Sequence, residues 1–321
     1  MFIVTQTYRG LEMDLNGRRD HQFHGVYPML FALFAPDGSL DREAMRRQLN
    51  AMVDIGSHGI AVLGLATESN KLSLAERQLL LEWVSEDLGG RLPLSVTIPG
   101  PNIAEQVALA KQARSCGAQW LVLQPPPVTG VSEASLAGYF SSVLEKVDLP
   151  TGLQIAPEYL GNAVSAATAL ELARRHANLS LLKVEMSAHA VAGLLRETNE
   201  KFTVFNGMDG VDLPDSMRAG CAGCIPGAEL ADYLVKIFNG LKSDRSDERQ
   251  AADEAYVRLA PLLTFMMDSL DRFLVYGKRL LCDRLGLPVE NASVRSPAGA
   301  IDAEGEAIVS HWSKSIGRLS A

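Results

Sequence analysis

The stretch GIAVLGLATESNKLSLAERQLLLEWVSEDLGGRLPLSVTIPG, from Gly59 to Gly100, decides how this chain folds. It begins with one continuous apolar run and ends with another, and an amphipathic segment lies between them. Ser73 and Glu76, three residues apart, form a capping box that marks the start of a helix. Continuous apolar runs are typical of strands that are buried on both faces. The stretch therefore predicts strand, helix and strand, the repeating unit of a parallel sheet.

The same alternation extends outward in both directions along the chain. There are eight apolar runs, and their starts lie roughly 19 to 34 residues apart, the spacing of βα units. Eight such units favour a closed (β/α)8 TIM barrel, an α/β fold, over an open doubly wound sheet. An open doubly wound sheet would be supported by a GxGxxG or Walker loop after one of its strands, and no run in this sequence is followed by either motif. The runs begin at Gly25, Gly59, Leu92, Gln119, Pro150, Leu179, Phe202 and Cys221.

The chain changes character beyond the last of these units. A polar segment is followed by long helical patterns, such as VRLAPLLTFMMDSLDRFLVYGKRLLCDRLG. The sequence therefore predicts three parts in one structural domain. These are an N-terminal extension over residues 1–23, the barrel over residues 24–242, and C-terminal helices over residues 243–321 packed on the barrel.

Composition narrows the kinds of partner. The 321 residues are 47% hydrophobic and 21% charged, as in a folded globular protein with a sizeable core. The net charge of −8 argues against nucleic acid or an anionic membrane as the main partner. No apolar window is long enough to span a membrane, and the first residues lack the order of a secretion signal. We expect a cytoplasmic protein that acts on a small molecule.

Lys183 is the most informative single residue. It interrupts the apolar run LSLLKVEM over residues 179–186, and lysine is rarely buried without a partner or a task. Removal from water favours the neutral amine, which is a nucleophile toward carbonyl carbon. Alternatively, the lysine extends to solvent at the strand end or pairs with Glu185. Position alone leaves both interpretations open.

The order of motifs resembles the dihydrodipicolinate synthase / N-acetylneuraminate lyase superfamily of Schiff-base barrels. The matching motifs are HGVYPMLFALFAPDGSLD, GLATES, QIAP, LLKVE, NGMDG and GCIPG, in this order. The resemblance implies that Lys183 forms an imine with pyruvate or another 2-keto acid, with no other cofactor. It also implies a homotetramer or homodimer.

The resemblance also implies which residues bind the substrate. The loop with Leu65, Ala66 and Thr67 stands where the family holds the keto-acid carboxylate, and its backbone N–H groups could do so. Asn206 and Ile225 belong to the loops that close the barrel mouth. Alternatively, the loop after the second strand is a turn that binds no ligand.

Three departures from the family pattern affect the chemistry. Gln154 replaces the tyrosine that relays protons, and an amide can only orient water or hydrogen-bond the substrate. Tyr159 stands where the synthase has an arginine for its second substrate. Residues 125–127 read Pro-Pro-Pro instead of Pro-Tyr-Tyr, which removes a second relay tyrosine.

Gln154, together with Lys183-Val184-Glu185, is similar to a subgroup of this superfamily, the 2-keto-3-deoxyarabonate dehydratases. Residues two apart on a strand share a face, so Glu185 should lie beside Lys183. Glu185 could then move the proton in place of the missing tyrosine. The alternative is an ion pair that only supports the amine.

These observations predict a lyase acting through a Schiff base on Lys183. It would dehydrate a 2-keto-3-deoxy sugar acid or cleave one to pyruvate and an aldehyde. The alternatives are condensation of the dihydrodipicolinate synthase type and a non-catalytic homologue that binds a keto acid. We expect no metal, because the CxxC of Cys221 and Cys224 stands alone and no histidine pair has ligand spacing.

Overall fold

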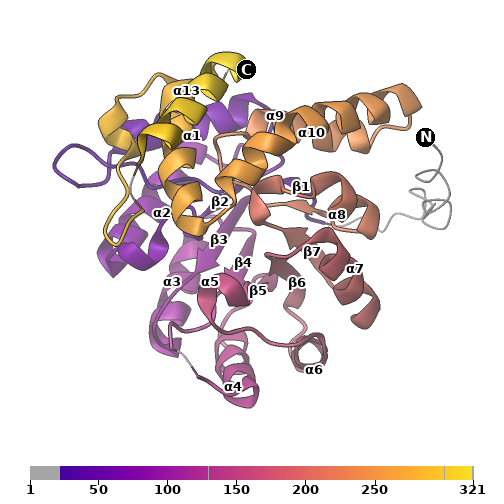
Figure 1. Cartoon of the computed structure of the whole chain (residues 1–321). Coiled ribbons are helices and arrows are strands. Elements are labelled where there is room, and N and C mark those ends of the chain that lie inside the picture. Colours follow the sequence, from indigo (N-terminus) through magenta and orange to yellow (C-terminus); the bar gives the residue numbers. More distant parts are fainter. Residues whose placement is uncertain (1–21, 129, 300, 320–321) are drawn as a thin grey trace.

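Eight parallel strands form a closed barrel, as predicted (Figure 1). The computed structural model describes residues 22–128, 130–299 and 301–319, so the predicted N-terminal extension lies almost wholly outside the described residues. The strands pair in the order β1-β8-β7-β6-β5-β4-β3-β2, and bridges from Met29 to Ala61 and Gly227 join the ends. The strands are β1 (Gly25–Val26), β2 (Ile60–Val62), β3 (Leu94–Ile98), β4 (Trp120–Leu123), β5 (Thr151–Ile155), β6 (Leu179–Val184), β7 (Thr203–Asn206) and β8 (Gly223–Cys224).

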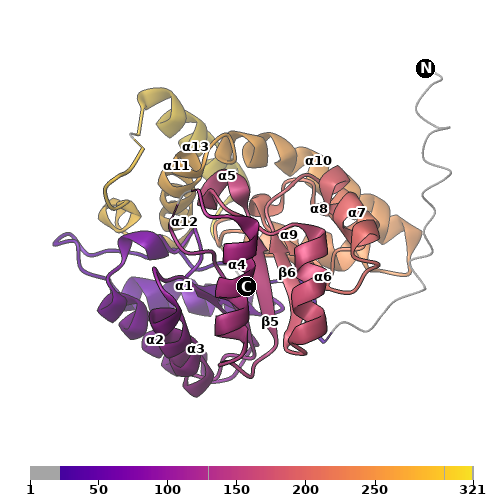
Figure 2. The same ribbon diagram turned by 90° about the horizontal axis from the view of Figure 1, so that it is seen from below.

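Helices alternate with the strands around the barrel (Figure 2). The capping box predicted at Ser73 and Glu76 is present at the start of α2. Asp41, Asn102, Ser132 and Ser187 cap other helices with side chains that accept from backbone N–H groups. The helices are α1 (Arg42–Asp54), α2 (Leu74–Leu88), α3 (Ile103–Ser115), α4 (Glu133–Leu144), α5 (Pro157–Leu160), α6 (Ala166–Arg175), α7 (Ala188–Glu197), α8 (Leu213–Ala219) and α9 (Ala231–Leu241).

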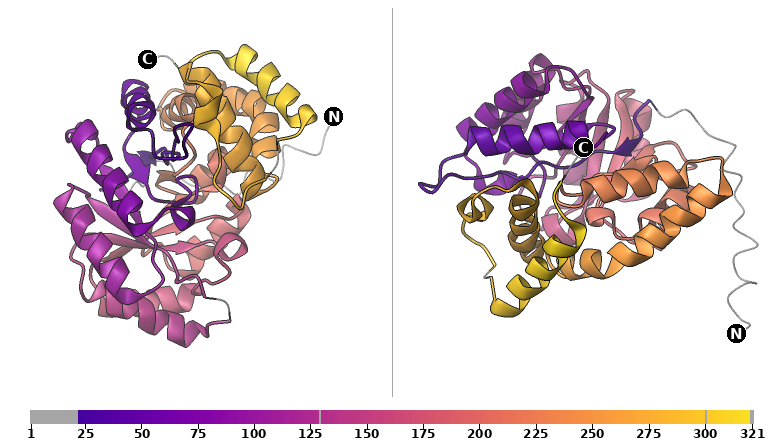
Figure 3. Two further views of the ribbon diagram at one scale, coloured as in Figure 1. Left: turned by 90° about the vertical axis from the view of Figure 1, so that its left-hand side faces the viewer. Right: turned by 90° about the horizontal axis from the view of Figure 1, so that it is seen from above.

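The remaining helices pack on one side of the barrel, and α10 lies against α9 (Figure 3). Further along the chain, α12 contacts α1. The segments are α10 (Ser246–Met266), α11 (Leu270–Arg272), a π-helical turn η3 (Phe273–Gly277), α12 (Lys278–Leu285), η4 (Val289–Ala292) and α13 (Ala303–Ile316). None of the helices in the described part of the chain combines the length and the apolar character that crossing a bilayer requires.

An aromatic cluster fills part of the barrel interior. The rings of Trp120 on β4 and Phe205 on β7 lie 5.1 Å apart, and Tyr27 lies 5.5 Å from Trp120. Phe23 stacks on the same tryptophan at 5.7 Å, and all four side chains are buried. Barrels of this class are packed inside and carry their ligands at the carboxyl ends of the strands. The site should therefore lie at that end.

Candidate active site

Lys183 lies near the carboxyl end of β6 and lines a small cavity of about 40 Å³. Its side chain is 3% exposed, and its Nζ lies 2.9 Å from Oε1 of Glu185. The alternation of a β-strand, which continues past β6 to Glu185, brings the two side chains to the same face, as predicted. The amine therefore has one close carboxylate in a site that is largely closed to water.

Glu185 is fixed by contacts at both of its oxygens. While Oε1 faces Lys183, Oε2 accepts a hydrogen bond of 2.6 Å from the backbone N–H of Met208. Gly207 leaves the room for this arrangement, because a Cβ at that position would overlap the Glu185 carboxylate. The loop after β7 thus positions the carboxylate against the amine.

Gln154 is the register partner of Lys183 on the neighbouring strand β5. It is buried, and its Oε1 accepts a hydrogen bond of 2.9 Å from Nε2 of Gln124. Its own Nε2 has no hydrogen-bond partner among the described residues. This amide beside the lysine therefore has an N–H group that can donate to a ligand. A catalytic role for Gln154 stays a prediction.

Four of the predicted substrate-binding residues line the cavity with Lys183. They are Leu65, Ala66, Tyr159 and Ile225, which come from loops after different strands. Burial raises the pKa of Tyr159, and the charge of Glu185 raises it further, so this phenol stays protonated at neutral pH. The wall is therefore apolar apart from a few groups that can form hydrogen bonds.

The side chains of the other two predicted substrate-binding residues, Thr67 and Asn206, form hydrogen bonds within the protein, and substrate binding by them stays a prediction. Thr67 is completely buried, and its hydroxyl donates a hydrogen bond of 2.6 Å to the carbonyl of Leu30. Asn206 donates to the carbonyl of Met186 at 2.9 Å and to Ser216 Oγ at 3.0 Å. Neither residue lines the cavity. Both hold the surrounding loops in place.

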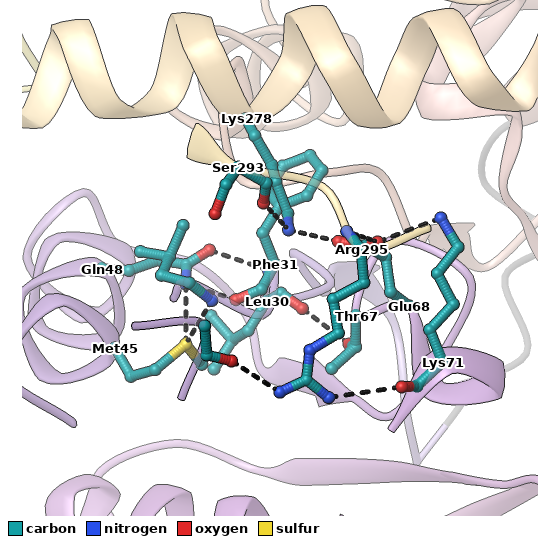
Figure 4. Close-up of polar contacts among 12 residues, drawn as sticks. Leu30, Phe31, Met45, Gln48, Thr67, Glu68, Lys71, Lys278, Ser293 and Arg295 are labelled. Atoms are coloured by element: carbon teal, nitrogen blue, oxygen red, sulfur yellow. Dashed lines mark hydrogen bonds and ion pairs between the residues drawn. The ribbon is translucent and has the colours of Figure 1, made fainter. Parts of the chain in front are cut away.

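A buried ionic cluster holds the loop after β2 in place (Figure 4). Glu68 is completely buried and has a left-handed backbone with φ of 52°. Its carboxylate pairs with Lys278 of α12, accepts from the backbone N–H of Arg295 at 3.1 Å, and lies 3.1 Å from Nζ of Lys71. Lys278 also donates to the carbonyl of Ser293 at 3.0 Å. The C-terminal helices thus support the loop that carries Leu65 and Ala66.

Sequence reasoning missed a pair of buried acids at the site. Asp209 lies in η2 (Met208–Gly210), directly after β7, and lines the cavity with Lys183. Its Oδ1 accepts a hydrogen bond of 2.8 Å from the backbone N–H of Gly227. Gly227 also lies against the carboxyl group of Glu229, which is completely buried. The signal in the sequence was two acidic residues within otherwise apolar or glycine-rich loops.

A larger cavity of about 360 Å³ lies next to the first one. Leu65, Tyr159 and Leu270 line both cavities. The polar groups of the larger cavity include Lys71, Arg77 and Gln124, beside prolines of the Pro-Pro-Pro segment. The two cavities together provide an inner site at the lysine and outer space for a longer polar molecule.

No group of three or more potential ligands in the described ranges could hold a metal ion. Burial raises the pKa of the Cys221 thiol to about 12 and also raises that of Cys224. Both thiols are therefore protonated at neutral pH, and the CxxC behaves as buried core.

The fold and the site define a barrel enzyme with a buried lysine amine, and its paired carboxylate, at the carboxyl end of the sixth strand. The dihydrodipicolinate synthetase family matches residues 22–314. The chain therefore belongs to this family and is a lyase.

Several proteins of this family resemble the chain. The L-2-keto-3-deoxyarabonate dehydratase of Azospirillum brasilense is 26% identical, with 73% of this chain and 78% of the relative covered. The "Probable 2-dehydro-3-deoxy-D-pentonate aldolase YjhH" of Escherichia coli K12 is 28% identical, covering 66% of this chain and 72% of the relative. The structure of YagE from Escherichia coli K12 in complex with pyruvate is 23% identical, with a TM-score of 0.81, and 92% of this chain and 99% of that chain are covered. This last likeness shows the shared fold.

Proposed function

We propose that this lyase forms an imine between Lys183 and the keto carbon of a 2-keto-3-deoxy sugar acid, and that it dehydrates this substrate. The observation that carries the proposal is the buried pair of Lys183 and Glu185, whose Nζ and Oε1 lie 2.9 Å apart at the wall of a cavity. A lysine that is withdrawn from water beside a proton acceptor is the arrangement that nucleophilic attack on a ketone needs.

The proposed reaction begins with covalent attachment. Nζ of Lys183 forms a bond to C2 of the substrate, and the keto oxygen leaves as water. The resulting protonated imine withdraws electrons from C3, so the C3–H bond becomes acidic. Glu185 then takes the C3 proton and the enamine forms. The enamine electrons expel the C4 hydroxyl, which leaves as water once it has gained a proton. Water then adds to C2 of the unsaturated imine, the C2–N bond breaks, and the 2-keto product is released with the amine of Lys183 restored. The imine itself is the electron sink, so this mechanism calls for no bound cofactor.

The walls of the two cavities suit such a substrate. The loop that carries Leu65 and Ala66 lies at the inner cavity, where its backbone N–H groups can bind the carboxylate beside the keto carbon. Tyr159 lies between the two cavities and can hydrogen-bond a hydroxyl of the sugar chain. The outer cavity has space for the remaining carbons.

Gln154 and Tyr159 favour this reaction over its alternatives. The matched relatives include proteins named for dehydration, for aldol cleavage and for 4-hydroxy-tetrahydrodipicolinate synthesis. Tyr159 offers no positive charge to a second carboxylate, which disfavours the synthase reaction. Gln154 cannot exchange protons near neutral pH, which leaves Glu185 as the proton carrier and favours the dehydratase over retro-aldol cleavage.

Reduction with borohydride in the presence of pyruvate tests the covalent step. We expect a reduced pyruvate adduct in the intact mass and, after peptide mapping, on Lys183 alone. Lys278 is a second buried lysine and serves as an internal control, because its amine is occupied by Glu68 and Ser293. Lys183→Ala should abolish the adduct. If neither pyruvate nor a longer 2-keto acid forms an adduct, the imine mechanism is wrong and a keto-acid-binding role replaces it.

The second step of the test is turnover. The wild type and Lys183→Ala are compared on 2-keto-3-deoxyarabonate and its stereoisomers, with the products identified by mass. Loss of water with the carbon chain intact supports the dehydratase. Formation of pyruvate and an aldehyde would assign retro-aldol cleavage instead. Efficient condensation of pyruvate with aspartate semialdehyde would overturn the assignment to sugar acids.

A further inference from the structure

The proposed dehydration includes a second proton transfer, because the departing C4 hydroxyl must gain a proton after Glu185 has taken one from C3. Lys183 is covalently occupied at that stage, and Gln154 has no proton to transfer near neutral pH. A further group that carries a proton at neutral pH would let the leaving oxygen be protonated without the return of the C3 proton from Glu185. Among the described residues, the cavity wall has two such groups, the phenol of Tyr159 and the carboxyl group of Asp209, and a carboxyl group is the stronger acid.

Asp209 and Glu229 are neighbouring acidic residues that are buried away from water. The side chains are 4% and 0% exposed, and the backbone of Gly227 lies against both carboxyl groups. Two ionised carboxylates have only acceptors to offer, so a hydrogen bond between them requires a proton on one of them. As ionised groups, Oδ2 of Asp209 and both Oε atoms of Glu229 have no partner among the described residues. The pair therefore holds one proton between two carboxyl groups.

The surroundings keep this proton in place at neutral pH. Burial is the main cause that raises the pKa of Asp209, and the negative charges of Glu229 and Glu185 raise it further. Burial also raises the pKa of Glu229, although the positive charge of Arg284 opposes this. Arg284 is itself paired with Asp232, at 2.9 and 2.7 Å, so its charge is largely neutralised.

The other groups near the pair do not provide a competing base. Cys224 lies beside Asp209, and burial keeps its thiol protonated. Gly227 lets the backbone come close to both acids: its N–H donates to Asp209 Oδ1, and a Cβ at this position would overlap the Glu229 carboxyl group. The backbone of Asp209 is left-handed, with φ of 50°. The loops after β7 and β8 are thus built around this contact.

We propose that Asp209 is the general acid of the reaction and that Glu229 positions and stores its proton. As the C4–O bond breaks, the leaving oxygen takes the proton of Asp209 and departs as water. The electron pair of the enamine becomes the C3–C4 double bond, and the pair Asp209–Glu229 is left fully ionised. The proton that Glu185 removed from C3, or one from solvent, restores the pair after product release. This inference rests on the proposed function, because it assigns the second proton transfer of that reaction.

Asp209→Asn is the primary test, because asparagine keeps the shape and the hydrogen bond but has no proton to transfer. We expect turnover of the 2-keto-3-deoxy acid to fall by about 100-fold or more, the usual contribution of a general acid. Borohydride trapping of pyruvate on Lys183 should be retained, since imine formation does not use Asp209. The control is Asp215→Asn, the same change at an exposed ion pair with Arg218 on the next helix, which should leave turnover unchanged.

The kcat–pH profile of Glu229→Gln distinguishes a role in holding the proton of Asp209 from a purely structural role. Removing the negative charge of Glu229 favours ionisation of Asp209, so its pKa falls. Asp209 then loses its proton at a lower pH, and the falling limb of the kcat–pH profile should shift to lower pH by about one unit or more. A structural defect would lower kcat equally at all pH values. This profile decides the question if Asp209→Asn fails to fold.

The shared proton can also be observed directly. Infrared difference spectra of wild type against Glu229→Gln at pH 7 should show the band of a protonated carboxyl group, and its absence would overturn the inference. Turnover of Asp209→Asn within about threefold of wild type, with trapping intact, would also overturn it and leave the proposed function standing. Absence of any adduct in the wild type would instead remove the proposed function, and this assignment with it.

Discussion

At the scale of single residues, the chemistry depends on what each oxygen of Glu185 contacts. One oxygen faces the amine of Lys183, and the other is held by the backbone of Met208. A carboxylate held only by side chains could turn away from the amine, whereas this one is fixed by the main chain. It can therefore accept a proton from Lys183 or from a carbon atom bound to Lys183 without moving far.

Glu185→Gln separates these two roles. We expect turnover to fall by about 100-fold or more, since an amide cannot accept the C3 proton. The reduced pyruvate adduct should still form on Lys183, because attack needs only the neutral amine. Turnover is measured by loss of substrate and the adduct by intact mass. Unchanged turnover would mean that Glu185 is only an ion-pair partner.

The sequence predicted some of these residues better than others. Lys183 and Glu185 were predicted because a charge inside an apolar strand is conspicuous and alternation fixes its neighbour. For Thr67 and Asn206 the sequence does not predict which backbone carbonyls their side chains contact, because a hydroxyl or an amide can bind a carbonyl as well as a ligand. The carbonyl that Thr67 contacts belongs to Leu30, 37 positions earlier in the chain, and no local pattern announces it.

At the scale of elements, the loop after β7 controls the site. It supplies the N–H of Met208 to Glu185, the open space at Gly207, and the side chain of Asp209. The apolar run predicted where β7 ends, but it did not predict the backbone conformation of the following turn. Asp209 meets Glu229 only because this turn and the loop after β8 close toward each other.

Gly207→Ala tests whether this loop positions the carboxylate. Alanine at position 207 adds a methyl group at the point where the backbone of Gly207 approaches the Glu185 carboxylate. It would overlap Glu185 and displace it, and a shift of about 1 Å at reacting groups can cost about 100-fold in rate. We expect a loss of kcat that approaches that of Glu185→Gln.

The matched control for this change is Gly138→Ala. Gly138 lies in α4, and a Cβ there meets no atom within 4 Å. Alanine is the better helix former, so this variant should be at least as stable as wild type and fully active. A normal kcat in Gly207→Ala would show that Glu185 can move aside without loss of activity, and that the loop after β7 does not position its carboxylate.

At the scale of the whole molecule, the barrel and the C-terminal helices share a buried ionic contact. Glu68 and Lys278 are 210 positions apart, yet both side chains are completely buried where the two parts meet. Burial lowers the pKa of Lys278, and the charge of Glu68 opposes that shift. The sequence predicted the barrel and the appended helices from their periodicity. It could not predict this contact, because the register between distant elements is set by packing.

Removing one partner of this contact should be costly. Glu68→Gln would leave the Lys278 charge buried without its carboxylate, and such a change typically costs about 3–5 kcal/mol. We expect urea unfolding at equilibrium to show this loss. The control is Glu86→Gln, which breaks the exposed pair with Arg42 and should change stability by less than about 1 kcal/mol. Equal effects of the two variants would show that the buried cluster does not join the two parts.

The aromatic cluster of Phe23, Tyr27, Trp120 and Phe205 has a consequence for the kinetics of this enzyme. Because these rings fill the barrel interior, whatever reacts at Lys183 must enter and depart through the mouth at the carboxyl ends of the strands. A fragment joined to Lys183 stays in the site until its covalent bond is hydrolysed, whereas a fragment without that bond is free to leave. Any reaction that split the substrate would therefore release its products in a fixed order, the free fragment first and the fragment attached to the lysine last.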